Sequence, residues 1–170
     1  YLHGLVRDAE KQKMSKSKNN IIDPLEMTTK YGTDAFRFAL AFATASGTDV
    51  VLSENRIRGM KHFANKLWNI ARYILSKIDR GSFSDQPETK TEADKDILEK
   101  LHQAHKKVGL ELEKFAFHEA AQTIYQFTWY ELADKYLENS KKELNKEVLA
   151  YCLINVLKLL HPFMPFITEE

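Results

Sequence analysis

Apolar residues recur at helical spacing along four long stretches of the chain, and short polar segments separate these stretches. The clearest stretch follows Ser53, a residue type favoured at helix starts, and has Glu54 in its first turn. Further stretches predict helices over about 94–114, 118–139 and 144–160. The apolar positions of the first helix are Ile57, Met60, Ala64, Leu67, Ala71, Ile74 or Leu75, and Ile78.

Four helices joined by polar turns predict a mainly α fold, an antiparallel helical bundle behind a small mixed region with a short strand and small helices. The 144–160 stretch is apolar almost all round, so it should be central and share one core with the helices that begin at Ser53 and His118. Asp34 is expected to cap a short helix. We place the domain boundary between residues 52 and 53.

Composition removes several classes of protein. With 170 residues and 44% hydrophobic content, the chain can bury a core. Its longest apolar stretch is broken by Lys158 and is too short to cross a membrane. The single cysteine, Cys152, can form no internal disulfide, which fits a reduced, cytoplasmic setting. His3, His62, His118 and His161 show no metal-ligand spacing, so we predict no structural metal.

Charge is divided unevenly along the chain. Residues 1–80 hold 14 Lys or Arg against 8 Asp or Glu, while residues 81–170 hold 11 against 16. One face of the predicted helix after Ser53 is basic over an arc of about 140° and contains no acid. Clustered positive charge favours phosphate-bearing partners. The residues on this face are Arg58, Lys61, His62, Asn65, Lys66, Asn69 and Arg72.

Residues 13–20 form a polar loop without apolar periodicity. Lys13 and Lys16 place two ammonium groups three residues apart, interleaved with the hydroxyls of Ser15 and Ser17. Such a cluster suits a triphosphate, because lysine donors on a loop stabilise the charge that builds on a leaving pyrophosphate. The alternative is an exposed basic loop that binds no ligand.

The order of these residues carries a resemblance. Lys13-Met14-Ser15-Lys16-Ser17 matches the KMSKS signature of class I aminoacyl-tRNA synthetases letter for letter, and residues 31–37 resemble that family's KYGADALR segment. The valyl members are resembled at residues 3–8, 52–54, 63–72, 117–121, 125–129 and 161–170. The chain is therefore identified as a member of this family, spanning the end of the catalytic domain, residues 1–52, and the anticodon-binding bundle, residues 53–170.

The resemblance implies a role for the loop in amino-acid activation. Lys13 and Lys16 would be the catalytic lysines, with Lys16 nearest the phosphates of ATP. All five signature residues would contact ATP, which Mg²⁺ accompanies. The parent reaction joins valine to ATP as valyl-adenylate and then transfers it to valine tRNA. Six residues are candidate tRNA contacts: Arg58, Lys61, Asn65, Lys66, Asn69 and Arg72.

The family also implies what a complete enzyme would need beyond these residues. The chain starts at Tyr1 without methionine and contains neither the HIGH signature, an amino-acid pocket nor an editing domain, so we expect an inactive fragment of a monomeric, cytoplasmic enzyme. The alternatives are an isoleucyl or leucyl fragment, a non-catalytic tRNA-binding module, and a structural bundle whose signature is accidental.

Three positions depart from the family pattern. Asn19 and Lys11 stand where glycines are usual, and Lys135 stands where tryptophan is expected. Asparagine tolerates left-handed backbone angles, so Asn19 should keep a glycine-like turn. Lys135 indicates either an exposed position or a changed RNA contact. Trp68 and Trp129 are expected to pack in the core, with stacking on RNA bases as the alternative.

Overall fold

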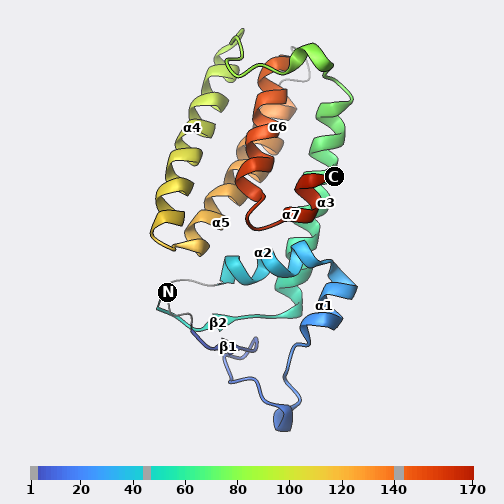
Figure 1. The fold of residues 1–170 in the computed structure, drawn as a ribbon, viewed down its shortest axis with the longest axis vertical. Coiled ribbons are helices and arrows are strands. Elements are labelled where there is room, and N and C mark those ends of the chain that lie inside the picture. Colours follow the sequence, from blue (N-terminus) through green and yellow to red (C-terminus); the bar gives the residue numbers. More distant parts are fainter. Residues whose placement is uncertain (1–3, 44–46, 140–143) are drawn as a thin grey trace.

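The computed structural model describes residues 4–43, 47–139 and 144–170. The sequence predicts a short extended segment over residues 1–6, of which residues 1–3, with His3, lie outside the described residues. Long helices stand side by side above a small mixed region that ends in a loop (Figure 1). In chain order the elements are β1 (Val6–Arg7), η1 (Lys16–Lys18), α1 (Pro24–Tyr31), α2 (Thr33–Ala43), β2 (Val50–Val51), α3 (Glu54–Leu75), η2 (Arg80–Ser82), α4 (Glu92–Glu113), α5 (Phe117–Gln126), η3 (Phe127–Leu137), α6 (Lys146–Leu160) and α7 (Pro165–Glu169).

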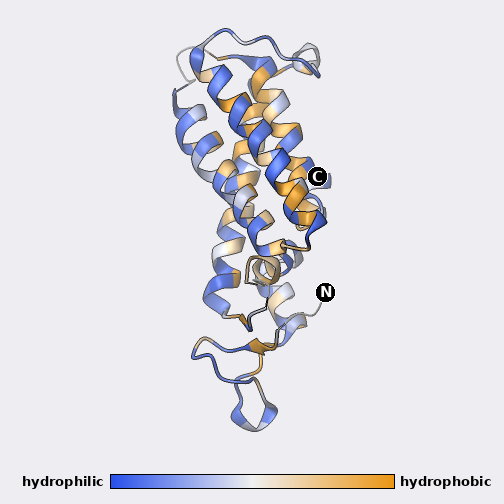
Figure 2. Cartoon of the chain, turned by 90° about the vertical axis from the view of Figure 1, so that its left-hand side faces the viewer, coloured by the Kyte–Doolittle hydropathy of each residue, from blue (hydrophilic) through white to orange (hydrophobic). Residues whose placement is uncertain are grey.

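The bundle consists of α3, α4, α6 and the continuous helix formed by α5 and η3. The expectation of one shared core is confirmed, because Leu67 of α3, Ile124 of α5 and Val156 of α6 belong to one buried cluster. Hydrophilic residues line the outer faces of the helices and most of the loop below them (Figure 2). Among the described residues, no helix has both the length and the apolar composition that a membrane crossing requires.

Side-chain caps set where the bundle helices begin. Ser53 Oγ accepts a hydrogen bond of 3.3 Å from the backbone N–H of Arg56, as its position predicted. Thr91 and Asp94 form a reciprocal capping box at the start of α4, two residues before the expected start. Asn145 caps α6. Local polar residues therefore define three of the four helix starts.

The predicted role of Asp34 is wrong. Asp34 lies inside the first turn of α2, and its carboxylate accepts hydrogen bonds from the backbone N–H groups of Phe166 (3.3 Å) and Ile167 (2.7 Å) at the start of α7. The neighbouring Arg37 donates to the backbone carbonyls of Pro162 (3.1 Å) and Phe163 (3.2 Å). Asp34 thus stabilises the N-terminus of another helix and ties α2 to the end of the chain.

The expected core position of Trp68 is also wrong, because its side chain is 45% exposed. Phe63 and Ile70 are buried with Leu67, so the apolar stripe of α3 is rotated away from Trp68, which lies about 100° around the helix from Leu67. Trp129 packs against the core, as expected, and stacks on Tyr125 with ring centroids 5.5 Å apart.

The expected third helix forms over its predicted length but changes its winding. Its second half, η3, is π-helical, a form in which each N–H bonds to the carbonyl five residues earlier. Thr128 is fully buried there, and its hydroxyl has no hydrogen-bond partner. Lys135 is exposed on η3, and a changed RNA contact at this position stays a prediction.

The small region rests on a second buried cluster and a short parallel strand pair. Val6 pairs with Val50 and Arg7 with Val51, so a short strand forms where the predicted extended segment ends and continues one residue beyond it. Gly4 lies so close to the backbone of Thr48 that a Cβ atom would approach its carbonyl oxygen to 2.1 Å. The buried residues of this second cluster are Met27, Ala39, Leu52 and Ile57.

Candidate functional site

The signature loop, residues 13–20, projects from the end of the molecule opposite the bundle (Figure 1). Its stem is fixed by the turn that Asp8 organises. Asp8 Oδ1 accepts hydrogen bonds from the backbone N–H groups of Glu10 (3.0 Å) and Gln12 (2.7 Å), and Arg7 forms an antiparallel bridge with Lys13. Lys11 takes a φ of 61° in this turn, the left-handed geometry that glycine usually supplies.

Asn20 closes the base of the loop. Its side-chain amide donates to Asp8 Oδ2 at 2.7 Å and to the backbone carbonyl of Lys13 at 3.3 Å. Its amide oxygen accepts from the backbone N–H of Ser15 at 2.8 Å. One side chain therefore joins both ends of the loop to the preceding turn.

The tip of the loop is a single 3₁₀ turn, Lys16–Lys18, that ends at Asn19. Asn19 has φ 50° and ψ 31°, so the expected left-handed turn is confirmed. The hydroxyls of Ser15 and Ser17 lie 3.2 Å apart, and Lys18 donates to the side chain of Gln12 at 3.1 Å. The lysine that follows the signature thus holds the loop against its stem.

The two lysines of the signature remain available to a ligand. Lys13 and Lys16 are exposed, and within the described part of the chain neither ammonium group forms a hydrogen bond or an ion pair. Met14 is half-buried and packs against the second cluster, so it anchors the loop. The loop therefore offers two unpaired cations and two hydroxyls on a fixed base.

The carboxylate at the base of the loop is engaged by hydrogen bonds. The hydrogen bond from Asn20, followed by that from the backbone of Gln12, holds the pKa of Asp8 below its ordinary value, so this carboxylate is charged and occupied. Sequence reasoning missed Asp8 and Asn20 as site residues. Their signal was weak, an Asp and an Asn at either end of a basic loop, a pairing also common in solvated turns.

The basic face of α3 forms, but its members differ in what they contact. Arg58, Asn65, Asn69 and Arg72 are exposed. Lys61 is half-buried and donates to the backbone carbonyl of Lys30 at 3.1 Å. These four exposed residues keep polar groups available along about four turns of helix.

Lys66 is also committed to contacts within the protein. Its ammonium group pairs with Asp134 of η3 at 2.8 Å and lies 4.8 Å from the ring centroid of Trp129. With Asn69 it lines a groove of about 300 Å³ between α3 and η3. The remaining lining residues are Ile70, Tyr73, Ala133, Asp134, Leu137 and Glu138. Asp134 of η3 thus pairs with the basic face of α3, on which α3 itself places no acid.

Two models of known protein families match this chain, one over its first part and one over its last part. Residues 1–53 match the family model described as tRNA synthetases class I (I, L, M and V), and residues 94–170 match the anticodon-binding domain of tRNA ligase. The valine–tRNA ligase of Geobacter sulfurreducens is 47% identical over the whole chain. The chain belongs to the class I aminoacyl-tRNA synthetases.

Other relatives agree with this family. The valine–tRNA ligases of Syntrophotalea carbinolica and Aquifex aeolicus are 47% and 40% identical, again over the whole chain. A solved LeuRS–tRNA–LeuAMS ternary complex from Agrobacterium radiobacter K84 contains a chain that matches 99% of this structure with a TM-score of 0.83 and 27% identity. The chain spans about a fifth of the length of these synthetases.

The signature loop lies within residues 1–53, which match the class I synthetase model, and this synthetase family uses ATP as a substrate. The α3 face, residues 54–75, lies between the two matched ranges, so its assignment to tRNA stays a prediction. Among the described residues, no three His, Cys, Asp or Glu side chains gather in a way that could hold a metal ion.

Proposed function

We propose that this chain is the part of a valine–tRNA ligase that contacts ATP through the signature loop and valine tRNA through the bundle. The observation that carries the proposal is the pair of exposed, unpaired ammonium groups of Lys13 and Lys16 on a loop closed by Asp8 and Asn20. Identity of 40–47% to valine–tRNA ligases along the whole chain supports valine over the sister amino acids.

The chemistry follows from the charge of the loop. When the valine carboxylate attacks the α-phosphate of ATP, pyrophosphate leaves and negative charge grows on its oxygens. Lys16, nearest the phosphates, and Lys13 stabilise that charge, while Ser15 and Ser17 donate hydrogen bonds. Met14 holds the loop to the second cluster. Mg²⁺ enters with ATP as its phosphate complex, since lysines and hydroxyls suit phosphate oxygens better than a hard cation.

The second step, transfer of valine to the tRNA terminal ribose hydroxyl, requires that tRNA be held on the same polypeptide. The bundle, residues 53–170, would bind its anticodon arm, with residues 1–52 as the end of the catalytic domain. Arg58 and Arg72 supply phosphate contacts, and Asn65 and Asn69 supply amides for bases. Lys61 and Lys66 would contact RNA only if they also kept, or gave up, their contacts within the protein, which are the carbonyl of Lys30 for Lys61 and Asp134 for Lys66. The full enzyme is proposed to act as a cytoplasmic monomer.

The experiment is to replace the matching segment of the Geobacter sulfurreducens valine–tRNA ligase with residues 1–170 and to measure valine-dependent exchange between pyrophosphate and ATP. Lys16→Ala should lower kcat of exchange by about 100-fold or more, since a lost transition-state donor costs roughly that much. Lys18→Ala, in the same loop but bonded to Gln12, is the matched control and should retain most of the exchange activity. Equal rates for Lys16→Ala and the parent chimera would contradict the proposal.

A further inference from the structure

A second groove, on the other flank of η3, is larger than the one beside α3. It has a volume of about 570 Å³, within the range of ligand-sized clefts, and lies between α4 and η3. Ala104 and Phe127 form its apolar floor. Its polar lining comes from both helices: Lys100, Gln103, Lys107, Thr123, Gln126, Tyr130, Glu131 and Lys135.

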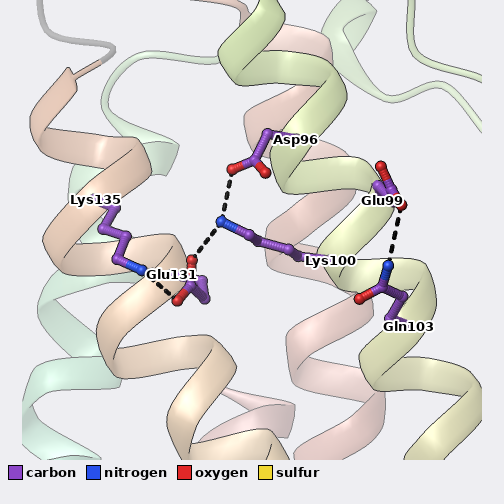
Figure 3. Close-up of polar contacts among 6 residues, drawn as sticks. All are labelled: Asp96, Glu99, Lys100, Gln103, Glu131 and Lys135. Carbon is purple, nitrogen blue, oxygen red and sulfur yellow. Dashed lines mark hydrogen bonds and ion pairs between the residues drawn. The ribbon is translucent and has the colours of Figure 1, made fainter.

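One carboxylate in this groove serves two lysines. Glu131 accepts from Lys100 of α4 at 2.8 Å through one oxygen and from Lys135 of its own helix at 2.6 Å through the other (Figure 3). Lys100 also reaches Asp96 at 2.7 Å. Lys107 is held only loosely, 3.7 Å from Glu111. Hydrogen bonds from Lys100 and Lys135 keep the pKa of Glu131 below its ordinary value, so it stays charged.

The groove has the parts that bind a single-stranded nucleotide. Lys100, Lys107 and Lys135 bring three cations to its lining. Their acid partners are Glu131 in the lining and Asp96 and Glu111 beside it, so a phosphate must compete with these carboxylates for the lysines. Tyr130 is 49% exposed and offers a ring face, and amide side chains stand on the rim. Cations along a groove and an aromatic platform are how proteins hold single-stranded RNA without sequence preference.

We propose that the α4–η3 groove binds one nucleotide of the RNA, with the phosphate between Lys100 and Lys135 and the base on Tyr130. The phosphate takes over hydrogen bonds that Glu131 now accepts. This inference rests on the proposed tRNA binding by the bundle. The α3–η3 groove and this groove lie on the two flanks of the same π-helical segment, so an RNA strand that crosses η3 would meet both.

The test is a titration of this chain into a fluorescein-labelled RNA hairpin of 17 nucleotides carrying the anticodon arm of valine tRNA, at several salt concentrations. Lys135→Gln should weaken binding by about threefold or more and reduce the slope of log K against log salt by about 0.7. Lys95→Gln is the matched control, because Lys95 is also 60% exposed and paired with a glutamate on its own helix, but does not line the groove.

Glu131→Gln separates binding from structural support. It removes the Glu131–Lys135 ion pair that Lys135→Gln also removes, together with the Glu131–Lys100 pair, so a structural role would move the affinity of both variants in the same direction. The proposal predicts opposite signs, because Glu131→Gln frees two cations and should tighten binding by about twofold or more. Tyr130→Ala should weaken binding by about fivefold or more with an unchanged salt slope.

Arg72→Gln, on the α3 face, distinguishes failure of this inference from failure of the proposed function. If Arg72→Gln weakens binding while Lys135→Gln matches Lys95→Gln, the groove assignment is overturned and the α3 assignment stands. If Lys135→Gln weakens binding and Glu131→Gln weakens it too, the groove assignment is also overturned. A chain that does not bind the hairpin at low salt overturns both.

Discussion

The side-chain amide of Asn20 donates a 2.7 Å hydrogen bond to the carboxylate of Asp8, twelve residues earlier in the chain. The bond closes the base of the signature loop, and Lys18 is the lysine whose charge acts on the Asp8 carboxylate. The loop that presents Lys13 and Lys16 is therefore held at its base by two residues outside the five-residue signature.

Removing the side chain of Asn20 should increase the mobility of the loop without unfolding the chain. In Asn20→Ala, hydrogen exchange of the backbone amides in residues 13–20 should accelerate by about tenfold or more, because three hydrogen bonds at the loop base are lost. The melting temperature should stay within about 2 °C, since Met14 is the one residue of the loop that packs against a buried cluster and Asn20→Ala leaves it in place. Asn69→Ala, an exposed amide on α3, should change neither quantity. Unchanged exchange of the loop amides would show that the hydrogen bonds of Asn20 do not hold the loop.

The strength of the hydrogen bond from Asn20 to Asp8 should depend on pH in a defined direction. The folded-state pKa of Asp8 is lowered, first by Asn20 and then by the backbone of Gln12. Its contribution is therefore fully present above the ordinary value of 3.8 and lost as pH falls through the lower folded value. After correction for intrinsic rates, loop exchange should rise below about pH 3.8 in the parent chain. In Asn20→Ala, exchange of the loop amides should already be fast at pH 6. If exchange in Asn20→Ala rose with falling pH as it does in the parent chain, the pH dependence could not be assigned to the bond between Asn20 and Asp8.

Asp94 should be the acid on which bundle stability depends most. It is 1% exposed and accepts from the hydroxyl of Tyr136 at 2.6 Å and the amide of Asn145 at 2.8 Å. Burial raises its pKa, but these and two backbone hydrogen bonds outweigh that effect and leave the pKa lowered. Asp94→Ala should cost about 3 kcal/mol in urea unfolding, because two buried donors lose their acceptor.

The matched control for Asp94 is Asp96, two residues along the same helix. The side chain of Asp96 is 61% exposed and pairs with Lys100 at the surface. Asp96→Ala should cost no more than about 1 kcal/mol. The stabilising effect of Asp94 should also fade as pH falls below about 3.8, since its folded pKa is the lower one. Equal losses in the two variants would show that the buried network adds nothing.

The rotation of the α3 stripe predicts opposite results at two adjacent residues. Leu67 is 1% exposed, so Leu67→Ala should destabilise the chain by about 2–5 kcal/mol through lost burial and a cavity. Trp68 is 45% exposed, so Trp68→Ala should cost less than about 1 kcal/mol despite removing the larger side chain. Urea unfolding followed by circular dichroism measures both. A larger loss for Trp68→Ala would restore the original expectation of a buried indole.

Periodicity predicted the long helices because their apolar stripes and caps are local in sequence. Ser53 and the runs in α4 and α6 carry their own signals. The errors arose where packing decides. Trp68 is an apolar residue type that usually lies in a core. Because Phe63 and Ile70 are buried instead, the apolar stripe of α3 faces away from Trp68.

Asp34 was misassigned for a similar reason. A carboxylate near a helix start is a cap for its own helix by local rules, yet its acceptor atoms are used by backbone N–H groups more than 130 residues away. The π-helical winding of η3 has no local marker in the sequence either. In the site, the five signature residues were found by their order, while Asp8 and Asn20 emerged only when the loop folded back on its stem.

The most direct measurement of the central claim is the affinity of this chain for three RNAs at two salt concentrations: valine tRNA, isoleucine tRNA, and valine tRNA with a changed anticodon. Intact valine tRNA is expected to bind more tightly than both others by about tenfold, and this preference should survive at the higher salt while overall affinity falls. Equal, salt-sensitive binding to all three would contradict it, and would reduce the bundle to a nonspecific phosphate-binding surface.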